Sequence, residues 1–140
     1  MKTLYQTRAI ATGGRTGRVR TADGGLDVTL AAPRELGGKG GDGNTPEQLF
    51  AAGYAACFLG ALKSVAAGRK VKLADDSTVS AEVGIGKRDD GQGYGLDVTL
   101  TISLPGVDPD VAKDLVRQAH IACPYSHATR NGLDVRLELF

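Results

Sequence analysis

This 140-residue chain lacks a strong charge of one sign and lacks the cysteine content of a disulfide scaffold. Its 17 lysine and arginine residues nearly balance its 16 aspartate and glutamate residues, which leaves a net charge of +1. A basic surface that would hold nucleic acid or an anionic membrane is therefore not expected. Two cysteines in a chain without export signals are expected to be reduced, as catalytic thiols or as small buried side chains.

The chain also has little that would direct it to a membrane. Its first eight residues contain no apolar region of the kind found in a cleaved signal peptide. The longest apolar run, from Leu49 to Leu62, is shorter than the roughly 20 residues that span a bilayer. These absences predict a cytoplasmic protein without a membrane partner.

A single domain over residues 1–140 is expected, because the length suits one hydrophobic core and no internal repeat or linker interrupts it. Alternating apolar and polar side chains predict strands at 3–12, 19–21, 26–30, 79–85, 96–104 and 133–139. Helices are predicted at about 46–67 and from 109 to Pro124, followed by a short helical turn that closes at Gly132. Meanders and hairpins dominate this order, so the fold class is α+β with antiparallel sheets.

The first helix has the clearest start signal in the chain. Thr45 is suited to the N-cap, Pro46 to the first helical position, and Gln48 completes a capping box. No charged residue occurs from Gln48 to Leu62, and a helix that is apolar on every side requires cover on every side. One small domain cannot readily surround such a helix, so we expect a homodimer in which a partner subunit covers part of it.

Cys57 lies in the middle of this helix. Its neighbours on the helical surface, at 100° per residue, include Phe50, Gly53, Tyr54 and Phe58. Aromatic walls beside a strip without side chains would form an apolar slot for a carbon-chain substrate. The alternative is that Cys57 is a small buried residue that fills a helix contact. Cys123, at the end of the second helix, allows the same two interpretations, and one thiol on each helix favours a redox pair modestly.

A reactive Cys57 would require a cation from elsewhere in the chain. Only the thiolate attacks, the N-terminal field of its own helix cannot help a residue at mid-helix, and burial would raise its pKa. One charge at about 4 Å supplies roughly 4 kcal/mol at an effective dielectric near 20, enough to lower the pKa by about 2.5 units. Arg15 and Arg18, in a glycine-flanked turn, are the natural donors, or else they form a solvated hairpin tip.

Glu47, in the first helical turn, could anchor such an arginine, or it could simply compensate the helix dipole. It lies about 15 Å along the axis from Cys57. A long arginine must therefore bridge part of that gap, or the partner chain must supply the carboxylate.

Three other motifs carry less weight. Gly38 to Gly43 matches the dinucleotide fingerprint, but it closes no strand-to-helix turn and is expected to be a flexible loop. His120, Cys123 and His127 are spaced as metal ligands on a helix would be, and Cys57 could be a fourth ligand. However, Pro124 interrupts that helix, so no bound metal is expected. Cys-Pro-Tyr-Ser at 123–126 resembles a one-cysteine glutaredoxin motif, yet that chemistry places the thiol at a helix N-terminus, whereas Cys123 ends a helix.

Three segments together resemble the organic hydroperoxide resistance family within the wider OsmC-like superfamily. They are Ala11–Arg18, Thr45–Phe58 and Cys123–Thr129, and the resemblance covers nearly the whole chain in order and spacing. The letters Gln-Leu-Phe-Ala-Ala-Gly-Tyr at 48–54 favour the organic hydroperoxide resistance branch over the OsmC branch. His127 departs from the family, which usually has Asn at this position.

The resemblance implies a thiol peroxidase that reduces alkyl, aryl and fatty-acid hydroperoxides to alcohols. By position, Cys57 matches the peroxide-attacking cysteine, Cys123 the resolving cysteine, Arg15 the arginine that holds the thiolate, and Glu47 the carboxylate paired with that arginine. The resemblance also implies an intertwined homodimer, in which antiparallel sheets wrap around two long central helices and the sites lie at the subunit interface.

The same resemblance implies no bound cofactor and an external reductant, a lipoyl dithiol carried on a lipoylated protein or supplied as dihydrolipoamide. Two other functions stay open at this point. One is a non-enzymatic thiol or metal-binding stress protein. The other is a glutaredoxin-like thiol oxidoreductase that uses Cys123 as its nucleophile.

Overall fold

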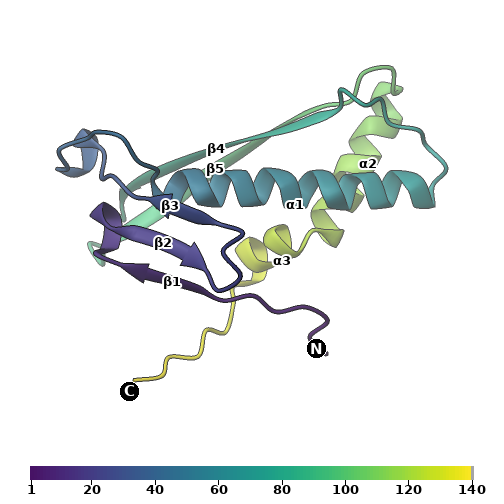
Figure 1. Ribbon diagram of the computed structural model, residues 1–140. Coiled ribbons are helices and arrows are strands. Elements are labelled where there is room, and N and C mark those ends of the chain that lie inside the picture. The colour runs from purple at the N-terminus through teal and green to yellow at the C-terminus, as the bar shows by residue number, and fades with distance from the viewer. Residues whose placement is uncertain (140) are drawn as a thin grey trace. The chain divides into compact units, whose positions relative to one another are not determined.

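The computed structural model of the protein describes residues 1–139, which form two compact units (Figure 1). The first unit comprises Met1–Phe50, and the second begins at Ala51. The long helix α1 (Pro46–Gly68) starts in the first unit and continues into the second. Mixed helices and antiparallel sheets confirm the α+β class, whereas a single domain over 1–140 stays a prediction.

The first unit contains a three-stranded antiparallel meander. Its strands are β1 (Ala9–Thr12), β2 (Arg18–Thr21) and β3 (Asp27–Thr29), with β2 in the centre. A 3-10 turn, η1 (Gly14–Thr16), joins the first two strands. Gly17 follows this turn at a position that only glycine fits, because a Cβ there would lie 1.7 Å from the carbonyl oxygen of Thr12. The predicted first strand, 3–12, is too long, since β1 pairs with β2 only over Ala9–Thr12.

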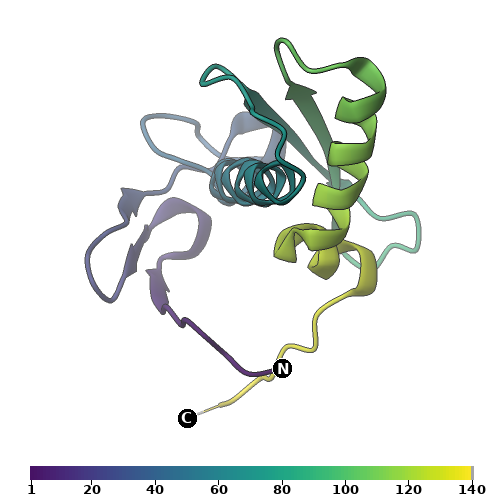
Figure 2. The ribbon, with the colours of Figure 1, turned by 90° about the vertical axis from the view of Figure 1, so that its right-hand side faces the viewer.

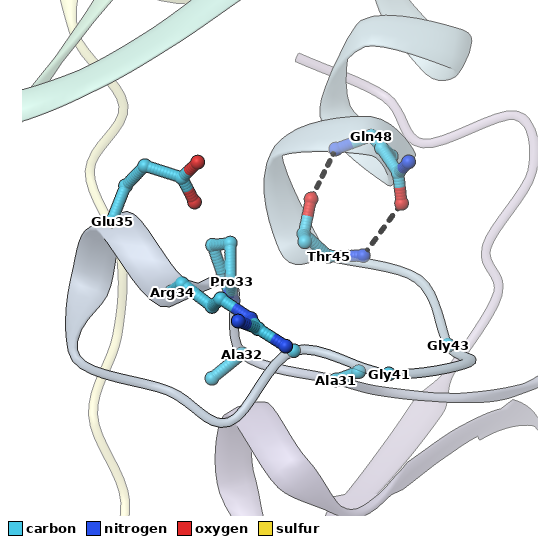
Figure 3. Close-up of a pocket in the computed structure, with 10 residues that line it drawn as sticks. Ala31, Ala32, Pro33, Arg34, Glu35, Gly41, Gly43, Thr45 and Gln48 are labelled. Carbon is cyan, nitrogen blue, oxygen red and sulfur yellow. Dashed lines mark hydrogen bonds between the residues drawn. The ribbon is translucent and has the colours of Figure 1, made fainter.

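The start of α1 is confirmed in atomic detail. The backbone N–H of Gln48 donates to Thr45 Oγ1 at 3.1 Å, and the N–H of Thr45 donates to Gln48 Oε1 at 2.8 Å (Figure 3). These two bonds form the reciprocal capping box that the sequence predicts. They satisfy two donors that a helix end otherwise leaves unpaired, so they define where α1 begins.

The second unit contains a long hairpin and two further helices. β4 (Thr78–Lys87) and β5 (Tyr94–Ser103) pair antiparallel along their whole length. α2 (Pro109–Ala122) is capped by Asp108, whose carboxylate accepts from the backbone N–H groups of Asp110 and Val111. α3 (Pro124–Asn131) follows after a single residue and ends at Gly132. The predicted hairpin, capped helix and closing turn are therefore confirmed.

The core of the second unit lies along one face of α1. Every fourth residue is buried there, namely Tyr54, Phe58, Leu62 and Ala66. From α2 and the residue after it, Leu115, Ala119 and Cys123 are fully buried as well. Asp114 of α2 is paired with Arg69, just beyond α1, and with Arg117. In Figure 2, which views α1 along its axis, α2 lies to one side of this helix and runs across its direction.

Most of the α1 surface is not covered by other parts of residues 1–139. By length and composition the helix could cross a membrane, with a mean hydropathy of 1.5 in its most apolar window, of which 22% is buried. The apolar run Leu49–Leu62 is shorter than this helix, which continues through Lys63 to Gly68. The core helix of a soluble protein can have the same length and hydropathy. We expect a partner subunit to bury the uncovered faces of α1.

The predicted half-buried strand at 133–139 is not formed. Leu133, Val135, Leu137 and Leu139 are 71%, 67%, 92% and 100% exposed. A strand exists only where another strand completes its hydrogen bonds. Among residues 1–139, none of the five strands pairs with this segment, so its alternating apolar side chains are left uncovered.

Candidate functional site

The two cysteines, far apart in sequence, meet in the second unit. Both are free thiols, and Cys123 Sγ lies 3.6 Å from Cys57 Sγ. A disulfide needs about 2.05 Å, so a small local movement would join them. Cys123 is fully buried, whereas Cys57 is partly exposed. The geometry is therefore compatible with two thiols or, after this movement, with one disulfide.

Local structure explains how Cys123 reaches this place. Its N–H donates to the carbonyl oxygen of Ala119 at 2.8 Å and completes α2, and its own carbonyl oxygen accepts from the N–H of His127 at 2.9 Å in α3. Pro124 lacks an N–H, so it suits the first position of α3. The expectation that Cys123 only ends a helix is thus incomplete, because it also precedes the first turn of another.

The surroundings of Cys57 act on its charge in opposite directions. Burial raises the pKa of the Cys57 thiol and is the largest influence, while a hydrogen bond from the backbone N–H of Tyr125 lowers it. The neighbouring Cys123 thiol raises this pKa further. The sequence-based expectation about helix N-termini concerned only the helix that contains Cys57, whereas this N–H belongs to another helix. Tyr125 is the second residue of α3, and the proline before it was the available signal for a new helix start.

Aromatic and hydroxyl groups of α1 and α3 form a cluster in which Tyr54 and Ser126 are buried and Tyr125 is exposed. Tyr54 Oη lies 2.9 Å from Ser126 Oγ and 3.4 Å from Thr129 Oγ1. The ring of Tyr54 is 5.8 Å from that of Tyr125, and a Cβ on Gly53 would lie 3.0 Å from Tyr125 Oη. Gly53 therefore provides the space into which the Tyr125 ring packs.

Two of the residues expected to line a substrate slot lie in the core of the described chain. Tyr54 is 4% exposed and Phe58 is 2% exposed, with the Phe58 ring 6.5 Å from the ring of His120. Gly53 and Phe50 are partly exposed. A role of these four residues in substrate binding stays a prediction.

The first unit contains a second polar pair from the predicted set. Arg15 in η1 donates two hydrogen bonds to Glu47 in the first turn of α1, Nη1 to Oε2 at 2.9 Å and Nη2 to Oε1 at 2.6 Å. The Arg15 guanidinium holds the pKa of Glu47 below its ordinary value of 4.5. Arg18, the other arginine of the turn, pairs with Asp27 across two exposed strands. Of the two candidate arginines, Arg15 is the one paired with Glu47.

The glycine-rich segment Gly38–Gly43 forms a loop between η2 (Arg34–Leu36) and Asn44. With residues 31–35 it borders a pocket of about 310 Å³, in which Arg34 and Glu35 are the charged side chains (Figure 3). It closes no strand-to-helix turn, so it lacks the geometry of a dinucleotide fingerprint. Within residues 1–139, no three His, Cys, Asp or Glu side chains gather as metal ligands would.

The chain is similar to known proteins over most of its length. Residues 38–138 match the family model of OsmC-like proteins. An organic hydroperoxide resistance protein of Xanthomonas axonopodis pv. citri is 54% identical over 138 residues, covering 99% of this chain and 96% of the relative.

Two solved structures are similar to this chain. The organic hydroperoxide resistance protein OsmC of Legionella pneumophila has a TM-score of 0.87 at 47% identity and 96% coverage of both chains. OhrB of Bacillus subtilis has a TM-score of 0.83 at 41% identity, covering 99% of this chain and 100% of that one. The chain belongs to the OsmC-like family and, within it, to the proteins of organic hydroperoxide resistance.

Proposed function

We propose that the protein is a cysteine-based peroxidase that reduces organic hydroperoxides to the corresponding alcohols. The observation that carries this proposal is the 3.6 Å separation of its only two thiols, one partly exposed and one fully buried. The relatives in this family are named for organic hydroperoxide resistance, which supports organic hydroperoxides as the substrate class. Alkyl, aryl and fatty-acid hydroperoxides are the proposed substrates within that class.

The proposed reaction has three balanced steps. The Cys57 thiolate attacks the terminal peroxide oxygen, the O–O bond breaks, and the alkoxide leaves and takes a proton to become the alcohol. The Cys57 sulfenic acid then condenses with the Cys123 thiol, which forms the disulfide and releases water. A lipoyl dithiol reopens the disulfide by two exchanges and is itself oxidised to the cyclic disulfide.

Arg15 and Glu47 have the proposed task of keeping Cys57 ionised. Burial raises the pKa of Cys57, so a peroxidase at neutral pH requires positive charge to offset burial. Arg15 is the proposed source, and its bidentate bonds to Glu47 would restrict the guanidinium to one orientation. The same charge would stabilise the departing alkoxide oxygen.

The proposed active form is a homodimer in the cytoplasm. The uncovered faces of α1 and the exposed alternation at 133–139 are two apolar surfaces that a second copy of the chain would bury. An added strand would also complete the backbone hydrogen bonds of 133–139. A cytoplasmic location would supply reduced dithiol to return both cysteines to their thiol state. No bound cofactor is required by this reaction.

Turnover with two peroxides tests the function. Dihydrolipoamide is supplied as the reductant, and the consumption of tert-butyl hydroperoxide is compared with that of hydrogen peroxide at equal concentration. Rapid turnover of the organic peroxide, with slow turnover of hydrogen peroxide, is the expected result. Absence of turnover with either peroxide would reject the proposal.

Two cysteine variants separate the roles of the sulfurs. Cys57→Ser should abolish peroxide consumption, because no nucleophile is left at the exposed position. Cys123→Ser should consume about one equivalent of peroxide and stop, since the sulfenic acid then has no resolving thiol. Trapping of that sulfenic acid on the Cys57 peptide is the confirming measurement. Sustained turnover of Cys123→Ser with dihydrolipoamide would remove Cys123 from the cycle.

A further inference from the structure

The first turn of α3 donates a backbone hydrogen bond to a residue of α1. The first N–H groups of a helix have no acceptor within that helix. The residue before α3, Cys123, has its sulfur 3.6 Å from that of Cys57. Pro124 has no N–H at all, and a hydrogen bond from the next donor, the N–H of Tyr125, lowers the pKa of the Cys57 thiol. This end of α3 also carries the positive end of its helix dipole. Cys57 therefore receives a hydrogen bond from the N-terminus of α3, which its own position in the middle of α1 cannot supply.

Side-chain contacts hold this end of α3 against α1. The Tyr125 ring packs at 5.8 Å from the ring of Tyr54 and over Gly53, where a Cβ would meet Tyr125 Oη at 3.0 Å. Ser126, fully buried, is bonded through its hydroxyl to the Tyr54 hydroxyl at 2.9 Å. Two consecutive residues of α3 are thus attached to one turn of α1, the turn that leads to Cys57.

We propose that Tyr125 is a further catalytic residue, which stabilises the Cys57 thiolate through its main-chain N–H, and that Gly53, Tyr54 and Ser126 position it. This inference rests on the proposed role of Cys57 as the attacking thiolate. An N–H donor favours the charged sulfur over the neutral thiol, because a hydrogen bond to an ion is stronger than one to a neutral group. The donor is fixed before the reaction and requires no rearrangement when the charge forms.

Removal of one N–H group, with the side chain left intact, is the direct test. The peptide from Cys123 to Phe140 can be synthesised and ligated to residues 1–122, because Cys123 is itself a ligation site. In the test protein the amide between Pro124 and Tyr125 is replaced by an ester, which removes the Tyr125 N–H. In the matched control the ester replaces the amide of His127, whose N–H bonds to the Cys123 carbonyl oxygen. Each protein thus loses one donor from α3.

The measurement is the rate of Cys57 alkylation by iodoacetamide as a function of pH, quantified on the Cys57 peptide by mass spectrometry. The Tyr125 ester should react about tenfold more slowly at neutral pH than the all-amide protein, with its midpoint displaced to higher pH. The His127 ester should retain the all-amide profile. Groups that also influence Cys57, the Cys123 thiol and, under the proposed function, Arg15, are the same in all three proteins.

Two results would overturn the inference. One is a Tyr125 ester profile that coincides with that of the all-amide protein. The other is an equal displacement in both esters, which would assign the effect to the stability of α3. Alkylation involves no peroxide, so it is independent of the peroxidase assay. If the protein does not turn over tert-butyl hydroperoxide but the Tyr125 ester still slows Cys57 alkylation, the proposed function is refuted. The role of the Tyr125 N–H in stabilising the Cys57 thiolate then remains supported.

Discussion

The Arg15–Glu47 pair gives the sharpest prediction about stability. Glu47→Gln keeps the size of the side chain and removes its charge, so Arg15 loses a carboxylate that accepts two of its hydrogen bonds. The Glu47 side chain is 12% exposed and that of Arg15 is 40% exposed. Exposed ion pairs contribute at most about 1 kcal/mol, and loss of one partner of a buried pair costs about 3 to 5 kcal/mol. After discounting for solvent screening at Arg15, we expect a loss of about 1.5 kcal/mol in the free energy of unfolding.

The assay is urea unfolding at one fixed protein concentration, because a dimer would make stability depend on concentration. A double-mutant cycle with Arg15→Ala isolates the coupling between the two side chains. Asp27→Asn is the matched control, since Arg18 donates a similar pair of bonds to Asp27 but both partners are exposed. Its effect should be much smaller.

The difference in unfolding free energy between the parent protein and Glu47→Gln should change with pH in a defined direction. Arg15 lowers the pKa of Glu47 below its ordinary value of 4.5, so the folded protein binds the Glu47 proton more weakly than the unfolded chain does. The stabilisation is therefore complete above pH 4.5 and is lost as the pH falls through the lower, folded-state pKa. Parent and Glu47→Gln should converge in acid. A coupling near zero at pH 7, or a difference that grows in acid, would refute this reasoning.

Three further predictions concern packing, capping and assembly. Tyr54→Phe should lower the free energy of unfolding by about 1 to 2 kcal/mol, because it leaves the fully buried Ser126 hydroxyl without its partner; an unchanged urea midpoint would contradict this. Thr45→Ala should cost about 1 kcal/mol through loss of the α1 cap, measured in the same way, and no loss would mean that Gln48 alone suffices. The double substitution Val135→Lys and Leu137→Lys should yield a monomer in sedimentation at micromolar concentration, and a persistent dimer would show that 133–139 lies outside the interface.

Elements with a local chemical signature were predictable from the sequence. The capping box at Thr45 and the N-cap at Asp108 need only residues that lie within one helical turn, and both form as expected. The β4–β5 hairpin follows from alternation on both sides of a glycine-containing turn. Such signals depend on neighbours in the chain, so the sequence contains all the information that they need.

Features that depend on distant contacts were predictable only in part. Spacing favoured a redox pair of Cys57 and Cys123 modestly, but no spacing rule could fix the 3.6 Å between their sulfurs, which depends on how α1 and α2 pack. The Tyr125 N–H was missed because α3 approaches Cys57 only in three dimensions. The segment 133–139 has the alternation of a strand but finds no strand to pair with in residues 1–139. Periodicity predicts the conformation that a segment favours, and pairing decides whether the segment adopts it.

If Cys57 and Cys123 form a disulfide as proposed, the unequal burial of the two sulfurs gives this bond a preferred direction of opening. An incoming thiolate must approach along the axis of the S–S bond, and solvent reaches only the Cys57 end, because Cys123 is fully enclosed. The electron pair of the breaking bond is then received by Cys123, which makes the buried sulfur the leaving group. The external thiol becomes attached to α1, and the enclosed thiol is the first of the two to be regenerated.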